Sequence, residues 1–234
     1  MRLSYTSYIP IKRQSISMRP LIVTTICLSF ISAPCIASKG SNYLYTGYQN
    51  TRVSDDGFQD YFDGAYNNSG SKQLYGGYVG GNYALNDTFF VGFDSSVTTR
   101  SSTALSDLSV QLGWYHPITS QVELYASGGV NWVRPQRRSS CRNDTILGLC
   151  DRETTKNYDE GFIGEAGAIV SINERWSLQP FYSYSDTHKH GLNNFGVVSS
   201  VDVLSWLAVD AGYEHTYSKN LNQNTLRLGA RFTF

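Results

Sequence analysis

The chain has 234 residues, with 19 Lys and Arg against 19 Asp and Glu, and aromatic residues make up 14% of it. Because it has no net charge, composition gives no reason to expect nucleic acid as a partner. The mean hydropathy of −0.30 argues against a bundle of membrane-spanning helices. It does not exclude a membrane-spanning barrel, in which lipid-facing and lumen-facing residues average out.

Residues 1–37 have the pattern of a secretory signal peptide. Arg19 precedes the apolar run Leu21–Ile31, which is too short and wrongly flanked for a stable transmembrane helix. Residues 35–37 then provide a small-x-small cleavage site. We expect cleavage before Ser38.

The amino terminus leaves two alternatives open. Met18 begins a compact signal of ordinary length, so the true start could be Met18 rather than residue 1. A lipidated Cys35 is the rival interpretation of the cleavage region, although Pro34 directly before it fits poorly. In either case the exported part, residues 38–234, is expected to form one domain.

The exported part shows ten stretches of about ten residues in which apolar and polar side chains alternate, as in half-buried strands. Ten antiparallel strands are therefore expected, with eight as the alternative if two stretches are loop extensions. Nine is disfavoured because bacterial barrels have an even strand number. The expected strands are Tyr43–Thr51, Gln73–Leu85, Thr88–Thr98, Asp107–His116, Gln121–Arg134, Tyr158–Ile172, Trp176–Thr187, Asn194–Val203, Trp206–Tyr217 and Asn224–Phe234.

Long and short connections alternate along the chain. Long polar loops are expected at Val53–Lys72 and Pro135–Asn157, and a more modest one at His188–Asn193. A short Ser/Thr loop is expected before Asp107. Tight turns such as Asn86-Asp87 follow the strands in between, and this alternation supports the even count.

Two of the four cysteines leave with the signal. Cys141 and Cys150 remain in one polar loop of an exported chain, so we expect them to form a disulfide. Closing so short a loop would stabilise the fold by about 2–3 kcal/mol in the chain-entropy model. A metal site is discounted, because there is no C-x-x-C and no nearby His.

The last strand has one wholly apolar face and one face with two arginines. Trp and Tyr also lie near many strand ends, where membrane barrels carry their aromatic girdles. The apolar face holds Leu226, Leu228, Ala230, Phe232 and Phe234, and the other holds Arg227, Gly229, Arg231 and Thr233.

The L-x-L-G-A-R-F-x-F ending, together with the signal, resembles the OmpA-like and porin-like small barrels of bacterial outer membranes. This resemblance implies a closed, monomeric, up-and-down transmembrane β-barrel with its apolar face toward lipid. It also implies that the insertion machinery recognises Phe232 and Phe234. Long loops would face outside the cell and short turns the periplasm, and the partners would be outer-membrane lipid and lipopolysaccharide.

The same alternation assigns a set of charges to the barrel interior. Buried charges must be paired, so we expect an ion-pair network that plugs the lumen or, alternatively, sets the selectivity of a narrow pore. The predicted network is Asp94, Glu123, Glu165, Asp202, Asp210, Glu214, Arg227 and Arg231.

A second group of charges flanks the longest loop. Arg134, Arg137, Arg138 and Arg142 could grip lipopolysaccharide phosphates, since guanidinium groups suit bidentate phosphate contacts. The alternative is an ordinary solvated charge run.

Three functions are expected from the sequence, in the following order of preference. First is a structural or surface-interaction role, with extracellular loops binding a host or matrix ligand as an adhesin or receptor would. Second is a narrow porin-like channel. Third is an outer-membrane protease, suggested by Asp186, His188 and His190, or a lipid A-modifying enzyme. We expect no catalytic residue, no metal and no cofactor, and therefore no enzyme.

Overall fold

The computed structural model describes residues 42–54, 73–138, 154–187, 190–219 and 221–234. The signal peptide, Cys141, Cys150, Arg142 and His188 lie outside the described residues. Within them, no helix is long and apolar enough to cross a membrane.

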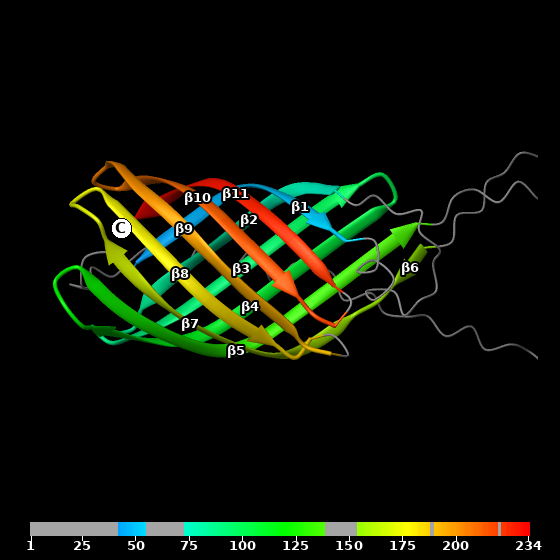
Figure 1. The fold of residues 1–234 in the computed structure, drawn as a ribbon, viewed down its shortest axis with the longest axis horizontal. Helices are drawn as coiled ribbons and strands as arrows, with labels where there is room; N and C mark the ends of the chain where they lie inside the picture. The colour runs from blue at the N-terminus through cyan, green and yellow to red at the C-terminus, as the bar shows by residue number, and fades with distance from the viewer. Residues whose placement is uncertain (1–41, 55–72, 139–153, 188–189, 220) are drawn as a thin grey trace, which may run out of the picture. The chain divides into compact units, whose positions relative to one another are not determined.

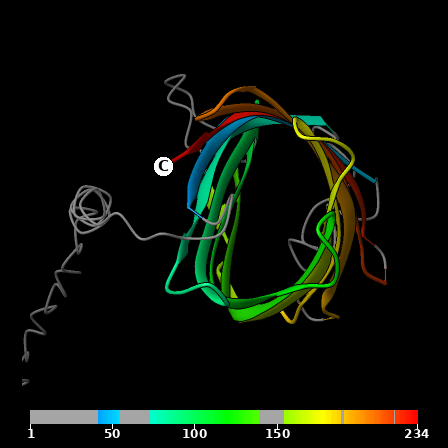
Figure 2. The ribbon, with the colours of Figure 1, turned by 90° about the vertical axis from the view of Figure 1, so that its left-hand side faces the viewer.

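The described residues form one antiparallel sheet that closes on itself when β4 pairs with β5 (Figures 1 and 2). β6 and β7 both pair with β5 and are two parts of one interrupted strand, so the barrel has ten strands. The strands are β1 Tyr43–Val53, β2 Gln73–Ala84, β3 Phe89–Arg100, β4 Thr103–Pro117, β5 Val122–Arg138, β6 Thr154–Lys156, β7 Asp159–Ser171, β8 Trp176–Ser185, β9 Leu192–Leu204, β10 Leu207–Tyr217 and β11 Asn222–Thr233.

The ten-stranded antiparallel barrel predicted from the alternation is therefore confirmed. Two connections differ from expectation. β3 and β4 continue to a tight turn at Ser101, whose φ of 54° is left-handed, although residues 99–106 were expected to form a short Ser/Thr loop. β5 continues through Pro135, which was predicted to begin a loop, because its carbonyl oxygen still accepts a hydrogen bond from the Asn157 amide at 3.1 Å.

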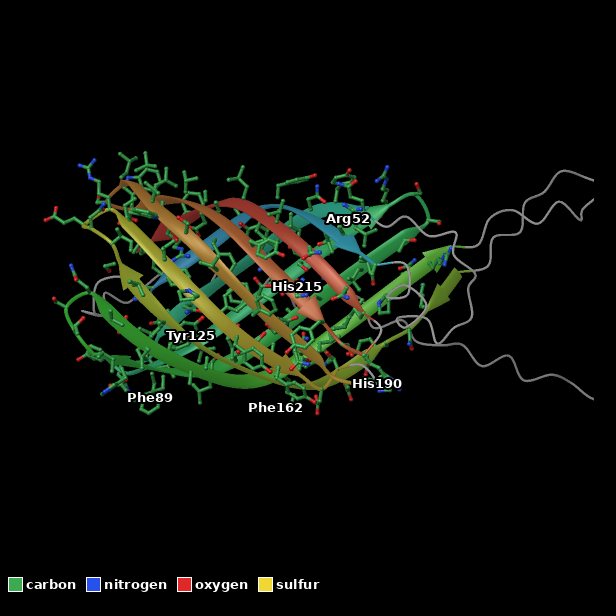
Figure 3. All side chains as sticks on the ribbon, in the orientation of Figure 1. Arg52, Phe89, Tyr125, Phe162, His190 and His215 are labelled. Carbon is green, nitrogen blue, oxygen red and sulfur yellow. The ribbon has the colours of Figure 1, made fainter. Side chains whose placement is uncertain are left out.

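Side-chain polarity is inverted relative to a water-soluble protein. On β11, Leu226 and Leu228 are 58% and 59% exposed on the outside, whereas Arg227 between them faces the interior. Phe89 and Phe162 likewise project outward (Figure 3). An apolar exterior around a polar interior is the polarity of a transmembrane β-barrel, in which every backbone group is paired and lipid solvates the outside.

Two apolar layers lie inside the barrel, one near each end. We call the end with the longer connections the loop end and the opposite one, where β1 begins and β11 finishes, the turn end. Near the loop end a buried cluster joins inward side chains of β1, β2, β5 and β9 with one that precedes β11; its members are Val53, Leu74, Val133, Leu192 and Leu221, with Leu105 packed against them. Near the turn end Phe90, Tyr115 and Tyr125 pack with Ile169 and Phe181.

Inward-facing glycines make room for aromatic rings inside the barrel. A Cβ on Gly113 would lie 2.1 Å from the Phe90 ring, and one on Gly80 would lie 2.3 Å from the Tyr45 hydroxyl. Neither distance is sterically possible, so these rings lie flat over the neighbouring strand only because the side chain there is absent. The positions of the inward-facing glycines therefore determine where the aromatic rings can pack.

Candidate functional site

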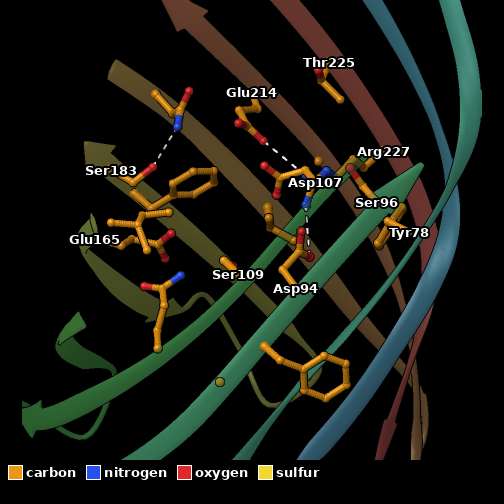
Figure 4. Close-up of a pocket in the computed structure, with 18 of the residues that line it drawn as sticks. Tyr78, Asp94, Ser96, Asp107, Ser109, Glu165, Ser183, Glu214, Thr225 and Arg227 are labelled. Atoms are coloured by element: carbon orange, nitrogen blue, oxygen red, sulfur yellow. Dashed lines mark hydrogen bonds and ion pairs between the residues drawn. The ribbon is translucent and has the colours of Figure 1, made fainter. Parts of the chain in front are cut away.

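A cavity of about 260 Å³ occupies the interior between the two apolar layers. Its wall combines hydroxyl, amide and charged side chains of nearly every strand (Figure 4). This cavity, which we call the chamber, contains most of the charged groups that the sequence assigned to the interior, and it is the candidate site of the molecule.

Arg227 is the central cation of the chamber. Its Nη1 lies 3.5 Å from Asp94 Oδ2 and its Nη2 lies 3.6 Å from Glu214 Oε2 (Figure 4). Glu214 is on β10, the adjacent strand, but Asp94 is on β3, three strands away around the barrel. The guanidinium therefore ties together parts of the wall that the backbone ladder does not join directly.

Aromatic rings support the same ion pairs. The Arg227 guanidinium lies over the ring of Tyr78, 5.2 Å from its centroid. The Tyr45 hydroxyl donates to Asp94 Oδ2 at 2.8 Å. A cation–π contact and a hydrogen bond thus hold both members of the Arg227–Asp94 pair in place.

Arg231 forms the second ion pair. Its Nε donates to Asp210 Oδ2 at 2.9 Å, and its guanidinium lies 4.6 Å from the centroid of the Tyr43 ring. Asp210 is buried, with its residue 6% exposed. A short charge-assisted hydrogen bond of this kind offsets the desolvation of both groups.

Two further carboxyl groups line the chamber without an arginine partner among the described residues. Glu165 Oε1 accepts a hydrogen bond from the Tyr125 hydroxyl at 2.8 Å, and Gln179 Nε2 donates to that hydroxyl at 3.1 Å. The other is Asp107, which was absent from the predicted network. It has the same strand parity as Ser109 and Gln111, so the alternation that assigned the other charges also carried the signal for Asp107.

Six of the eight residues of the predicted network line the chamber: Asp94, Glu165, Asp210, Glu214, Arg227 and Arg231. Glu123 and Asp202 do not. Both lie within three residues of a strand end at the turn end of the barrel, where Glu123 is half-buried and Asp202 is exposed. Strand parity determines which face a side chain occupies, but it does not determine its height in the barrel.

The arginines near the loop end do not form one surface group. Arg134 is exposed on the outside, as a contact with lipopolysaccharide requires. Arg137 is instead 5% exposed and shares the inward side of β5 with Asn131 and Val133, which differs from the surface position expected. The reason is that β5 extends to Arg138, so the alternation continues into the predicted loop. The Arg138 side chain and Arg142 lie outside the described residues.

The aromatic residues of the predicted insertion signal lie on the outside of the barrel. Phe232 stacks on Trp206 with ring centroids 6.2 Å apart, and Phe234 is 62% exposed. The Phe234 amide donates to the Asn42 carbonyl at 3.2 Å, which joins the two chain ends of the barrel. Both rings are therefore exposed at the turn end.

Two of the residues that suggested an enzyme, Asp186 and His190, lie in the described part of the chain. Asp186 Oδ1 accepts a hydrogen bond from the Phe162 amide and so links the end of β8 to β7. His190 is exposed. In the described part of the chain, no three His, Cys, Asp or Glu residues are grouped so that they could hold a metal ion.

No protein-family model matches the chain, and no curated protein matches it. Among solved structures it is similar to Ail, the attachment invasion locus protein of Yersinia pestis, at 16% identity and TM-score 0.41 over 82% of this chain and 97% of that one. It is also similar to Neisserial surface protein A, at 13% identity and TM-score 0.41 over 83% of this chain and 97% of that one. The KdgM porin matches at 10% identity and TM-score 0.39 over 81% of this chain and 99% of that one. Matches this distant do not distinguish one role from another.

Proposed function

We propose that this chain, an outer-membrane β-barrel by its fold and polarity, works at the cell surface through its loop-end connections rather than by conducting solutes through its lumen. The observation that carries this proposal is the Arg227 bridge. One guanidinium joins Asp94 on β3 to Glu214 on β10 in the middle of the interior. A small barrel filled in this way gives up the space that a pore needs.

The apolar layers support the same proposal. Leu74 and Leu221 are fully buried in the loop-end layer, and Phe90, Tyr115 and Tyr125 pack together at the turn end. A solute that passed through would have to force apart the packed side chains of both layers and give up its water there, which carries a desolvation cost. The barrel then acts as a rigid scaffold that holds its loops at the membrane surface.

Conductance in planar lipid bilayers tests the closed lumen. Wild-type protein is expected to insert without steady current above that of the bare lipid. A variant that combines Leu74→Gly, Leu192→Gly and Arg227→Ser with Phe90→Gly and Tyr125→Gly opens both layers and should produce discrete openings, which shows that the assay detects an opened barrel. Leu228→Gly, on the lipid-facing side, serves as the matched control and should remain silent. Discrete wild-type openings would overturn the closed-lumen proposal.

The surface role needs a separate experiment. Residues 139–153 are replaced by a short Gly/Ser linker, and adhesion of cells that produce the protein is measured on plates coated with collagen or heparin. The control replaces residues 118–120, at the opposite end of the barrel. Adhesion is expected with wild type and with the control, and it should be lost with the linker variant. Equal adhesion by all three proteins and by cells without the protein would contradict a surface-binding role.

A narrow cation-conducting pore is the second candidate, and one observation favours it. The chamber of about 260 Å³ is lined by more carboxyl groups than guanidinium groups. Rings of carboxylates select for cations in channels. The wild-type bilayer recording separates the two functions, because cation-selective steps would favour the pore.

A further inference from the structure

The chamber has an excess of acidic groups. Among the described residues that line it, five carboxyl groups face two guanidinium groups; the acids are Asp94, Asp107, Glu165, Asp210 and Glu214, and the cations are Arg227 and Arg231. Arg231 is engaged by Asp210, and Arg227 is shared by Asp94 and Glu214. The arginines alone therefore do not balance the carboxylates of a chamber bordered at each end by apolar side chains.

A second, independent observation is a buried acceptor oxygen in the chamber wall that has no hydrogen-bond partner. Asn131 is 5% exposed and lines the chamber, yet its Oδ1 has no hydrogen-bond partner. Its Nδ2 donates to Ser185 Oγ at 3.5 Å, and this orientation of the amide leaves the carbonyl oxygen without a hydrogen-bond partner. Gln49, 3% exposed on β1, likewise leaves its Oε1 without a partner in the chamber. Buried carbonyl oxygens are acceptors, and an unmade bond at such an oxygen is costly.

Asn131 and Asp107 lie together on one part of the wall. They are on the neighbouring strands β5 and β4, where Ser109 pairs with Asn131 and Asp107 pairs with Val133. The β4–β5 side of the chamber thus carries both a carboxyl group without an arginine partner and a carbonyl oxygen without a hydrogen-bond partner. Both groups can bind a small cation through oxygen.

We propose that the chamber binds a hard metal cation on its β4–β5 side, with the Asp107 carboxylate and Asn131 Oδ1 as its protein ligands. Oxygen ligands are those that alkali and alkaline-earth cations prefer. Because no three acidic, His or Cys side chains of the described residues are grouped to hold a bare ion, the cation keeps part of its water shell. This cation stabilises the closed barrel and is independent of which ligand the surface loops bind.

The first test is refolding in detergent with potassium, sodium, magnesium or calcium chloride, each compared with choline chloride at equal ionic strength. Choline carries the charge but cannot take oxygen ligands. At least one metal salt is expected to raise the unfolding temperature by about 2–4 °C over choline. Asp107→Asn, which keeps the side-chain shape, should abolish that rise. Asp202→Asn, which removes an exposed carboxylate at the turn end, should preserve it.

A second measurement decides the matter even if Asp107→Asn fails to fold. Wild-type crystals grown with rubidium chloride are measured at the rubidium absorption edge. An anomalous peak in the chamber beside Asp107 and Asn131 is expected. A chamber without a peak, together with equal unfolding temperatures in all salts, would overturn the site and leave protonation of the carboxyl groups as the way the charge is balanced.

Discussion

Arg231 and Asp210 are joined by a 2.9 Å hydrogen bond between neighbouring strands β11 and β10, inside the barrel and beneath the ring of Tyr43. They are not directly opposite in register: Arg231 pairs with Ala208, and Asp210 pairs with Gly229. The long guanidinium reaches diagonally over the glycine. This pair stabilises the closing strand from the inside, where both groups are largely removed from bulk water.

Removing one partner of that pair should be costly. Arg231→Leu leaves the buried Asp210 carboxylate without its cation, and we expect a loss of about 3 kcal/mol in the free energy of unfolding. Urea-induced unfolding in lipid vesicles measures this loss. Arg175→Leu, in an exposed turn, is the control and should change stability little. Equal stability of the two variants would contradict a structural role for the Arg231–Asp210 pair.

Gly113→Ala should destabilise the turn-end layer. The added methyl group would lie 2.1 Å from the Phe90 ring, so the ring or the strand must move, at a cost of about 1–3 kcal/mol. Gly212 also faces the interior, but a Cβ there would lie 3.5 Å from its nearest neighbour, an ordinary contact. Gly212→Ala is therefore the matched control. If both variants unfold at the same urea concentration, the close fit of Phe90 over Gly113 does not contribute to stability.

On the lipid-facing side, the free-energy cost of a charged substitution should depend on its depth in the bilayer. Leu228 is 59% exposed at the middle of β11, so Leu228→Lys would place an ammonium group near the bilayer centre, at a cost of about 2–4 kcal/mol. Leu204, at the end of β9, is 49% exposed. Leu204→Lys should cost about 0–1 kcal/mol, because it lies near the interface. Unfolding from vesicles gives both values. A greater cost at Leu204 would mean that the apolar belt has been placed wrongly.

The terminal aromatic residue should matter for assembly rather than for the folded state. Phe234 is 62% exposed and its ring is absent from the buried clusters of the described residues. Phe234→Ala is expected to lower the amount of protein that reaches the outer membrane of producing cells, while refolding in detergent proceeds as for wild type. Tyr217→Ala, which removes another outward aromatic at the loop end, controls for general loss of surface area. Wild-type amounts of Phe234→Ala in the membrane would contradict recognition of the carboxy terminus.

Strand parity could be followed from the sequence alone, while the closed barrel was what the resemblance of the last strand implied. Successive side chains on a strand must face opposite sides, so Leu228 and Arg227 could not share an environment. The alternation of long and short connections supported an even strand count, with ten expected and eight still open until the closed sheet showed ten. The same rule assigned Asp94, Asp210 and Arg231 to the interior. It applies equally to Asp107, which has the parity of Ser109 and Gln111 on β4.

Tertiary structure alone decided which interior groups meet. Arg227 reaches Asp94 on a strand three positions away, a distance that depends on the curvature of the closed sheet and not on local sequence. Height in the barrel separated Asp202 from the chamber, and the extension of β5 turned Arg137 inward. The two apolar layers formed for the same reason, because side chains such as Leu74 and Leu192, far apart in the sequence, join one buried cluster only when the sheet closes.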